Sequence, residues 1–249
     1  MHRKRIKTEL LVHDMKNPLA VIEAGIHLLI NKDGENGSLT EKQLKVLHRI
    51  LRNTKVAMGL VNDILEVGRS TVGVIDKDKC RFYDFISYPL VEIFDLTDHN
   101  TAERTRECHS LPALKAVLSD KDILLNMDEC LWSQEVYLDL GKIRQILRNL
   151  ISNALKYRKK IIEIEIGRDK DFLSLSVRDD GEGIPKSYHK KVFECYFQLK
   201  DDKDSCVRGH GLGLAGVLIL VEDMGGEMRL ESDEGKGAKL SVRIPLDRQ

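Results

Sequence analysis

Residues 161–185 read IIEIEIGRDKDFLSLSVRDDGEGIP, and this stretch decides the fold of the larger part of the chain. Its runs IIEIEIG and FLSLSVRD alternate strictly between apolar and polar residues, which predicts two strands that are each covered on one face. The helical pattern GKIRQILRNLISNALKY precedes them at 141–157, with Asp139 as its expected N-cap. A second helix is predicted at 211–225, and 226–246 predicts two strands joined by a Gly-Lys-Gly turn. The pattern as a whole predicts an α/β sandwich.

The region before this sandwich pattern is less uniform. KCRFYDFI at 79–86 predicts a short strand that leads into a helix, and ILLNMDE at 123–129 and QEVYLD at 134–139 predict strands. The segment 95–118 between them is charged and weakly patterned, so it predicts no definite element.

The first 73 residues follow a different period. Apolar residues recur at alternating spacings of three and four, the heptad pattern of helices packed side by side. The polar, glycine-rich turn NKDGENGS at 31–38 separates the two runs, and Ser38 with Glu41 has the capping-box spacing that would start the second helix. The two runs are Val12, Met15, Leu19, Ile22, Ile26 and Leu29, and then Leu44, Leu47, Leu51, Thr54, Met58, Val61 and Leu65.

A single hairpin of this kind would leave an apolar stripe exposed, whereas two hairpins would cover each other as a four-helix bundle. The sequence therefore predicts an α+β chain in two parts. Residues 1–73 form a helical-hairpin dimerisation domain, which is a four-helix bundle in the homodimer, and residues 74–249 form a two-layer α/β sandwich.

Composition excludes several classes of protein. Lys plus Arg and Asp plus Glu are both 40, so the basic excess expected of a nucleic-acid-binding protein is missing. No apolar run approaches the roughly 18 residues of a membrane span, and the start has no signal-peptide core. The five cysteines form no CxxC pair, which favours a reducing compartment. We expect a cytoplasmic protein whose sensory input, and any membrane attachment, comes from a segment outside this sequence or from another protein.

The string HDMKNPL at 13–19 carries nucleophilic chemistry on the first helix. Neutral imidazole can attack phosphorus near pH 7, and Asp14 can accept the proton of the other ring nitrogen of His13. Asn17 lies one turn further along, and Pro18 is expected to loosen the helix. A lone histidine in such a place is usually an ordinary exposed residue, so this reading depends on the motifs that follow.

RNLISNALKY at 148–157 places Asn149 and Asn153 on one face of the helix predicted at 141–157. An amide oxygen is a suitable hard ligand for Mg²⁺, which takes most of its other ligands from phosphates and water. Lys156 and Tyr157 are candidates for contacts with phosphate and adenosine. On their own, two asparagines on a solvated helix face are common.

Two glycine strings complete the pattern. In VRDDGEGIP at 177–185, Asp179 can accept from an exocyclic amine such as that of adenine, and Gly181 and Gly183 let the backbone approach a flat base. Asp180 is interpreted as turn surface. In RGHGLGLA at 208–215, Gly209, Gly211 and Gly213 stand before a helix, where free N–H groups attract phosphate. Each string is weak alone, but their order and their places at element boundaries make a strong combination.

With these motifs the sequence, from about residue 9 to 245, resembles the sensor histidine kinases of two-component signalling. HDMKNPL resembles the H-box, RNLISNALKY the N-box, and DDGEGIP and GHGLGLA the two glycine boxes. VFECYFQ, with Phe193 and Phe197, resembles the F-box.

The resemblance implies an ATP-binding sandwich of the Bergerat type and a function as a protein-histidine kinase. It implies that His13 is the phosphoacceptor, Asp14 its base, Asn153 the Mg²⁺ ligand, and Asp179 the adenine contact. Asn149 and Lys156 would contact phosphate, and 186–208 would be the lid over ATP. Arg208, at the end of the lid, is equally readable as a phosphate contact or a solvated surface residue. The partner would be a response regulator receiver domain, and Asn17 is placed to orient a water that dephosphorylates that regulator.

Two functions of other kinds remain open. One is an ATPase or a serine kinase with the same ATP-binding fold, although such ATPases resemble one another in having a glutamate where this sequence has Asn149. The other is an inactive dimeric scaffold, which would need none of the ATP motifs.

The stretch between Phe82 and Ile123 is also longer than is usual in the family.

Overall fold

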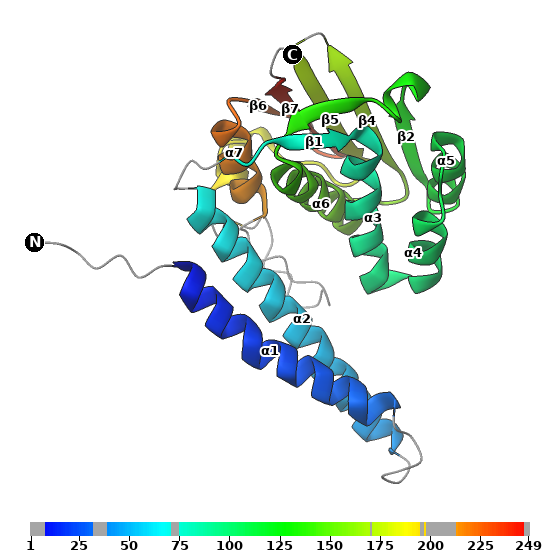
Figure 1. The fold of residues 1–249 in the computed structure, drawn as a ribbon, viewed down its shortest axis with the longest axis vertical. Coiled ribbons are helices and arrows are strands. Elements are labelled where there is room, and N and C mark those ends of the chain that lie inside the picture. The colour runs from blue at the N-terminus through cyan, green and yellow to red at the C-terminus, as the bar shows by residue number, and fades with distance from the viewer. Residues whose placement is uncertain are drawn as a thin grey trace, which may run out of the picture. The chain divides into compact units, whose positions relative to one another are not determined.

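The computed structural model describes residues 8–31, 39–70, 75–169, 171–194, 197 and 213–246. Within these ranges it describes all side chains except those at 8–15, 31, 52, 55, 56, 58–60 and 62–70. Contacts divide the chain into two units, 1–73 and 74–249 (Figure 1). No helix in the described ranges has both the length and the apolar character that a membrane crossing requires.

The first unit is a hairpin of two long helices, α1 (Thr8–Asn31) and α2 (Glu41–Ser70), which pack side by side (Figure 1). The predicted heptad pattern is thereby confirmed as a hairpin. Ile26 and Val61 are buried on it, and Leu19 packs against Val61. Thr54, the polar member of the seam, is buried with its hydroxyl donating to the Ile50 carbonyl at 3.0 Å. A set of large apolar side chains stays exposed in the single chain: Val21, Ile22, Leu28, Leu29, Val46 and Ile50.

The start of α2 differs from the prediction. The helix begins at Glu41, and the capping residue is Thr40. The Gln43 backbone N–H donates to Thr40 Oγ1 at 3.3 Å, and the Thr40 N–H donates to Gln43 Oε1 at 2.8 Å. This reciprocal pair is a capping box. Ser38, the predicted cap, lies outside the described residues.

The second unit is built on a five-stranded sheet with strand order β2-β4-β5-β7-β6. β2 runs parallel to β4, and every other neighbouring pair is antiparallel. A separate antiparallel pair joins β1 (Asp78–Arg81) to β3 (Glu135–Leu138). The five strands are β2 (Ile123–Met127), β4 (Ile162–Asp169), β5 (Phe172–Asp179), β6 (Glu227–Ser232) and β7 (Ala238–Pro245).

Three helices lie against one face of this sheet: α3 (Phe82–Thr97), α6 (Leu140–Tyr157) and α7 (Gly213–Asp223) (Figure 1). The alternating apolar residues of β4, β5 and β7 point toward them and join one continuous core. Asp139 caps α6 as predicted, accepting from the Lys142 N–H at 3.0 Å. The side chains that α6 gives to the core are those of Ile143, Ile146, Leu147, Leu150, Ile151 and Ala154. The predicted two-layer sandwich is confirmed.

The segment for which the sequence predicted no definite element contains two short helices, α4 (His99–Arg106) and α5 (Leu111–Ser119). Each has a side-chain N-cap, because Asp98 accepts from the Thr101 N–H at 3.2 Å and Ser110 accepts from the Ala113 N–H at 3.4 Å. α5 packs against the edge strand β2. The extra length between Phe82 and Ile123 is therefore folded helix.

Candidate active site

The asparagine face of α6 meets the start of α7. Asn149 and Asn153 are both partly buried on this helix. A Cβ added at Gly213, the first residue of α7, would lie 3.9 Å from Asn153 Nδ2. Two segments that are 60 residues apart in sequence thus come together, and they are the asparagine motif and the end of the second glycine string.

The C-terminal end of α6 meets the first glycine string. A Cβ built on Gly181 would lie 2.2 Å from the Tyr157 carbonyl oxygen and 2.7 Å from Asp179 Oδ1, so no side chain fits there. The sequence alone attributed this glycine to the approach of a flat base. The structure gives a further reason, since the backbone at Gly181 lies directly against the last residue of α6.

Asp179 ends β5 at the same place. Its Oδ1 accepts from the Gly181 N–H at 2.8 Å, which holds the carboxylate beside the glycine turn. Burial raises the pKa of Asp179 above its ordinary value, although hydrogen bonds from the backbone of Gly181 and Ala238 act in the opposite direction. A partly desolvated acceptor at the end of a strand is a suitable partner for an amine of a bound base.

Asp180 is more than turn surface. Its Oδ1 accepts from the backbone N–H groups of Lys159 and Lys160, each at 2.9 Å. These donors, with that of Lys160 first, hold the pKa of the Asp180 carboxyl below its ordinary value. The side chain therefore ties the glycine string to the chain that leaves α6, and the interpretation of this residue as turn surface is corrected.

Ile184, which follows Gly183 in the glycine string, is held through both its backbone N–H and its carbonyl. The Ile184 N–H donates to Ser232 Oγ at 2.8 Å, and the Ile184 carbonyl lies 2.9 Å from His189 Nε2. Because a carbonyl only accepts, the ring nitrogen is the donor. Gly183 has a φ of +72°, and a Cβ on it would lie 2.0 Å from the Asp233 carbonyl oxygen. The string is thus held against the turn between β6 and β7.

The described start of the predicted lid contains two short 3₁₀ turns, Lys186–Tyr188 and Lys191–Phe193. Phe193 packs against the core of the second unit, and the Phe197 ring lies 5.7 Å from that of Tyr188. The lid positions 195–196 and 198–208, which include Arg208, lie outside the described residues. So do Gly209 and Gly211 of the second glycine string.

The remaining predicted residues occupy separate places. Lys156 has its Nζ 4.9 Å from the centre of the Tyr157 ring, and Tyr157 is 53% exposed. His13, Asp14 and Asn17 all lie in α1 of the first unit, with Asn17 exposed, and the side chains of His13 and Asp14 lie outside the described ones.

The described side chains near Asn153 suit a cation that takes most of its ligands from phosphate and water. The described residues contain no group of three or more His, Cys, Asp or Glu side chains suited to a metal. Asn153 instead offers one side-chain amide, whose oxygen is a suitable ligand for a hard cation, near the start of α7. A helix start is a place where phosphate is favoured. Such a site fits Mg²⁺ that arrives with phosphate and keeps water ligands.

The contacts that assemble this site could not be predicted from the sequence. These are the Tyr157 carbonyl, the Asp180 clamp, Ser232 and His189, all of which join segments far apart in the chain or side chain to backbone. A local pattern carries no signal for them, apart from the doubled aspartate in VRDDGEGIP.

Comparison with known proteins separates the same two parts. Residues 9–73 match the family model described as "His Kinase A (phospho-acceptor) domain". Residues 138–248 match the model described as "Histidine kinase-, DNA gyrase B-, and HSP90-like ATPase".

Two curated relatives align over most of the chain. The sensor histidine kinase WalK of Bacillus subtilis is 27% identical over 239 residues, which is 94% of this chain and 35% of that protein. The aerobic respiration control sensor protein ArcB of Escherichia coli is 30% identical over 237 residues, which is 93% of this chain and 27% of that protein. The chain thus spans about a third of the length of these relatives.

A solved structure has the same fold. The crystal structure of full-length ShkA in complex with AMPPNP superposes with a TM-score of 0.66 at 21% identity. The match covers 97% of this chain and 46% of that one.

Proposed function

Because this chain belongs to the sensor histidine kinases of two-component signalling, we propose that it is a protein-histidine kinase core. It takes the γ-phosphoryl group of ATP onto His13 and passes it to an aspartate of a response regulator receiver domain. The observation that carries the proposal is the meeting of Asn153, the Tyr157 end of α6, the Asp179–Gly183 string and the start of α7 in a chain whose hairpin carries HDMKNPL.

The proposed chemistry at His13 is a nucleophilic substitution. One neutral ring nitrogen forms a bond to the γ-phosphorus, the bond from that phosphorus to the bridging oxygen breaks, and ADP leaves with the electron pair. Asp14 accepts the proton of the other ring nitrogen, which keeps the attacking nitrogen available. The phosphoryl group then moves to the carboxylate of the regulator.

The second unit supplies the nucleotide site in this proposal. Asp179 receives the adenine amine, Gly181 and Gly183 bring the backbone close to the base, and Asn149 and Lys156 face phosphate with Tyr157 beside the nucleoside. Gly209, Gly211 and Gly213 offer backbone N–H groups to phosphate, and Asn153 holds Mg²⁺. When bound, Mg²⁺ neutralises the charge of the phosphates.

The amide of Asn149 also weighs against a simple ATPase. An amide is no general base, so it does not activate water as a carboxylate would.

Incubation with labelled ATP and Mg²⁺ tests the proposal. A histidine kinase gives acid-labile, base-stable label on the chain, a serine kinase labels only an added partner, an ATPase releases phosphate without label, and a scaffold does neither.

We further propose that residues 1–73 are the dimerisation and phosphotransfer domain and that 74–249 are the catalytic domain. The support for a homodimer is the set of exposed apolar side chains on the hairpin, which includes Ile22 at 44% exposure and Leu28 at 58%. Burying one Leu or Ile side chain contributes about 1.5–3 kcal/mol. A second hairpin that completes a four-helix bundle removes these side chains from water.

The dimer gives a prediction at Ile22. In one chain this residue is half exposed, so an aspartate there is tolerated, but a second hairpin over it would bury an unpaired charge. We expect Ile22→Asp to weaken dimerisation at least about 100-fold and to reduce autophosphorylation with it, while ATP binding by the second unit persists. Light scattering beside a nucleotide-binding assay measures both.

Ala24→Asp is the matched control. Ala24 is exposed on the same helix and lies at the heptad position opposite the seam, so the same new charge there should leave the dimer intact. A wild-type chain that is monomeric at micromolar concentration and fully active would contradict the dimer proposal.

Asp179 gives a prediction that links stability and binding. Burial raises its pKa in the folded chain above the unfolded value, so its ionised form lowers stability once the pH rises through the folded pKa. Asn keeps an oxygen for the Gly181 N–H. We therefore expect Asp179→Asn to raise the Tm by about 1–3 °C near pH 7.5, with the gain shrinking as the pH falls. ATP affinity should fall by about tenfold or more.

Asp180→Asn is the opposite case. The pKa of Asp180 is lowered by backbone donors, so its ionised form adds stability above its unfolded pKa that is lost as the pH falls. We expect this variant to have a lower Tm at neutral pH. Thermal unfolding across pH 4–8, with isothermal titration of ATP, measures both variants. Equal Tm and equal ATP affinity of wild type and Asp179→Asn would show that Asp179 is not the adenine contact.

A further inference from the structure

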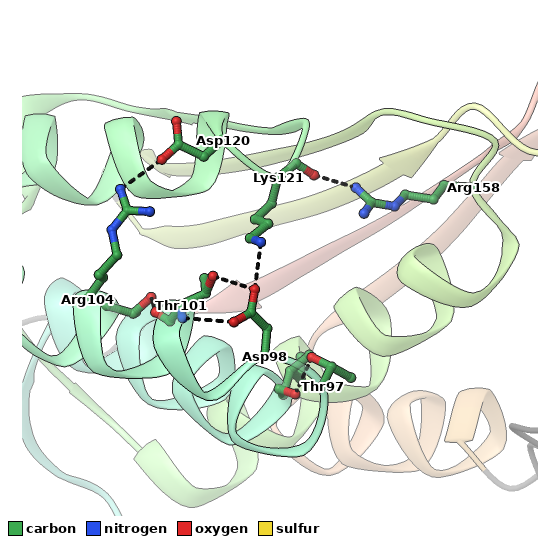
Figure 2. A network of polar contacts seen from close by, with 9 residues as sticks. Thr97, Asp98, Thr101, Arg104, Asp120, Lys121 and Arg158 are labelled. Atoms are coloured by element: carbon green, nitrogen blue, oxygen red, sulfur yellow. Dashed lines mark hydrogen bonds and ion pairs between the residues drawn. The ribbon is translucent and has the colours of Figure 1, made fainter.

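The C-terminal end of α6 is braced from a part of the chain that the motifs do not include. Arg158 follows Tyr157 and is the C-cap of α6, and its backbone N–H donates to the Ala154 carbonyl at 2.9 Å. Its side chain crosses to the turn between α5 and β2, where Nη1 donates to the Lys121 carbonyl at 2.7 Å (Figure 2). The residue beside the Tyr157–Gly181 contact is thus anchored to a neighbouring element.

Lys121 is itself held by the start of α4. Its Nζ donates to Asp98 Oδ2 at 2.6 Å, and both side chains are about one-third exposed (Figure 2). Asp98 also caps α4 through the Thr101 N–H and accepts from the Thr101 hydroxyl at 2.8 Å. The Lys121 ammonium, followed by the Thr101 donors, keeps the pKa of Asp98 well below its ordinary value. The contacts therefore run without a break from α4 to the end of α6.

Two clamps act on the same short piece of backbone. Asp180 holds the N–H groups of Lys159 and Lys160 from the glycine string, and Arg158 holds the Lys121 carbonyl on the other side. Directly before these residues, the Tyr157 carbonyl lies too close to Gly181 for any Cβ to fit. A small displacement of this backbone would therefore also move Gly181 and Asp179, the proposed adenine contact.

We propose that Arg158 is a positioning residue for the nucleotide and that α4 supports it through the Asp98–Lys121 ion pair. The inference rests on the proposed function, since it assigns a role within the same ATP site. Arg158 does not touch the nucleotide in this account. It keeps the C-terminal end of α6 in the position in which the glycine string and Asp179 can bind the base.

The test uses the full chain and measures the Kd for ATP-Mg beside kcat and KM for autophosphorylation. A displacement of about 1 Å that arises far from the reacting atoms can change a rate by about 100-fold, so a small shift of the α6 end is enough for a measurable effect. We expect Arg158→Ala to raise Kd and KM by about 5–10-fold and to change kcat by less than about twofold. Arg158→Lys, which can still donate to the Lys121 carbonyl, should restore most of the affinity. A purely structural role would not give this division between KM and kcat.

Arg104→Ala is the matched control. It removes an ion pair with Asp120 at 2.7 Å in the same region, but that pair has no bond to α6 (Figure 2). Its Kd should equal that of wild type. Asp98→Asn keeps an oxygen for the Thr101 N–H but replaces the oxygen that accepts from Lys121 Nζ and from the Thr101 hydroxyl. It therefore weakens the brace at the Asp98–Lys121 ion pair and tests it even if Arg158→Ala does not fold. It should raise Kd by about 2–3-fold.

The possible failures are distinguishable. A wild-type chain that binds ATP-Mg and labels His13, with an unchanged Kd in Arg158→Ala or in Asp98→Asn, overturns this inference and leaves the proposed function standing. A wild-type chain that does not bind ATP-Mg overturns the proposed function itself.

Discussion

Replacement of His13 by Gln is expected to reduce incorporation of labelled phosphate from ATP to background, a loss of at least about 100-fold. Gln is close to His in size and polarity, but its amide nitrogen is not a nucleophile, so the bond to phosphorus cannot form. The helix should persist, because Gln is a good helix former. Labelling by ATP-Mg, followed by acid and base treatment of the product, measures the effect.

Two changes on the same helix serve as controls. His27 is an exposed histidine 3.9 Å from Glu23, and His27→Gln should keep full labelling. Asn17 lies one turn after His13, and Asn17→Ala should also keep the label on His13 while slowing the loss of phosphate from the regulator, if its amide orients the water in that step. Labelling that survives in His13→Gln would mean that the acceptor lies elsewhere.

Replacement of Asn153 by Ala is expected to lower autophosphorylation by about 100-fold or more. The reason is the loss of the amide oxygen that we assign to Mg²⁺, which leaves the charge of the phosphates less neutralised during transfer. Asn153 is only partly buried, so its truncation to Ala removes little packing, and the fold and the dimer should survive. Circular dichroism, light scattering and the labelling rate together measure this outcome.

Ser152→Ala is the matched control for this change. Ser152 is exposed at the adjacent position of α6, so the same truncation there should leave the rate unchanged. Binding of ADP in the presence of EDTA should be similar in wild type and Asn153→Ala, because the lost contact is to the metal. Normal labelling of Asn153→Ala with ATP-Mg would show that the metal ligand has been wrongly assigned.

The parts of the fold that follow from burial periodicity could be predicted from the sequence. β4 and β5 alternate because one face of each strand meets the core, and α6 repeats its apolar residues because one face of the helix does the same. Their boundaries are marked by local signals such as Asp139. The glycine strings could be placed because each stands at such a boundary.

α4 could not be predicted in this way. The residues that it buries are Thr101, Ala102 and Thr105, so the helix has no apolar stripe for a pattern to detect. Its position depends on Asp98, whose partner Lys121 is 23 residues away. Asp98 is itself a residue type that is preferred at the N-cap, and this signal could have indicated the helix start. The start of α2 was predicted at the wrong residue for another reason. Ser38 with Glu41 and Thr40 with Gln43 both have the spacing of a capping box, and in the described residues it is Thr40 and Gln43 that form it.

The motifs of the candidate site could be predicted from the sequence, but most of the contacts between them could not. The pattern gave Asn153, Asp179 and Gly181 as separate residues. The reason that Gly181 must be glycine includes the Tyr157 carbonyl, and the reason for the second aspartate is the backbone of Lys159 and Lys160. Both are contacts between elements, which depend on how the helix and the strand pack.

The most direct test of the central claim is the chemical identity of the phosphorylated residue. The wild-type chain is incubated with ATP and Mg²⁺, digested at neutral to mildly basic pH, and examined by mass spectrometry with fragmentation that preserves phosphoramidates. We expect one phosphohistidine, at position 13, that is lost in acid and absent without Mg²⁺. Phosphate on serine, on threonine or on another histidine, or ATP turnover with no phosphorylated residue, would contradict it.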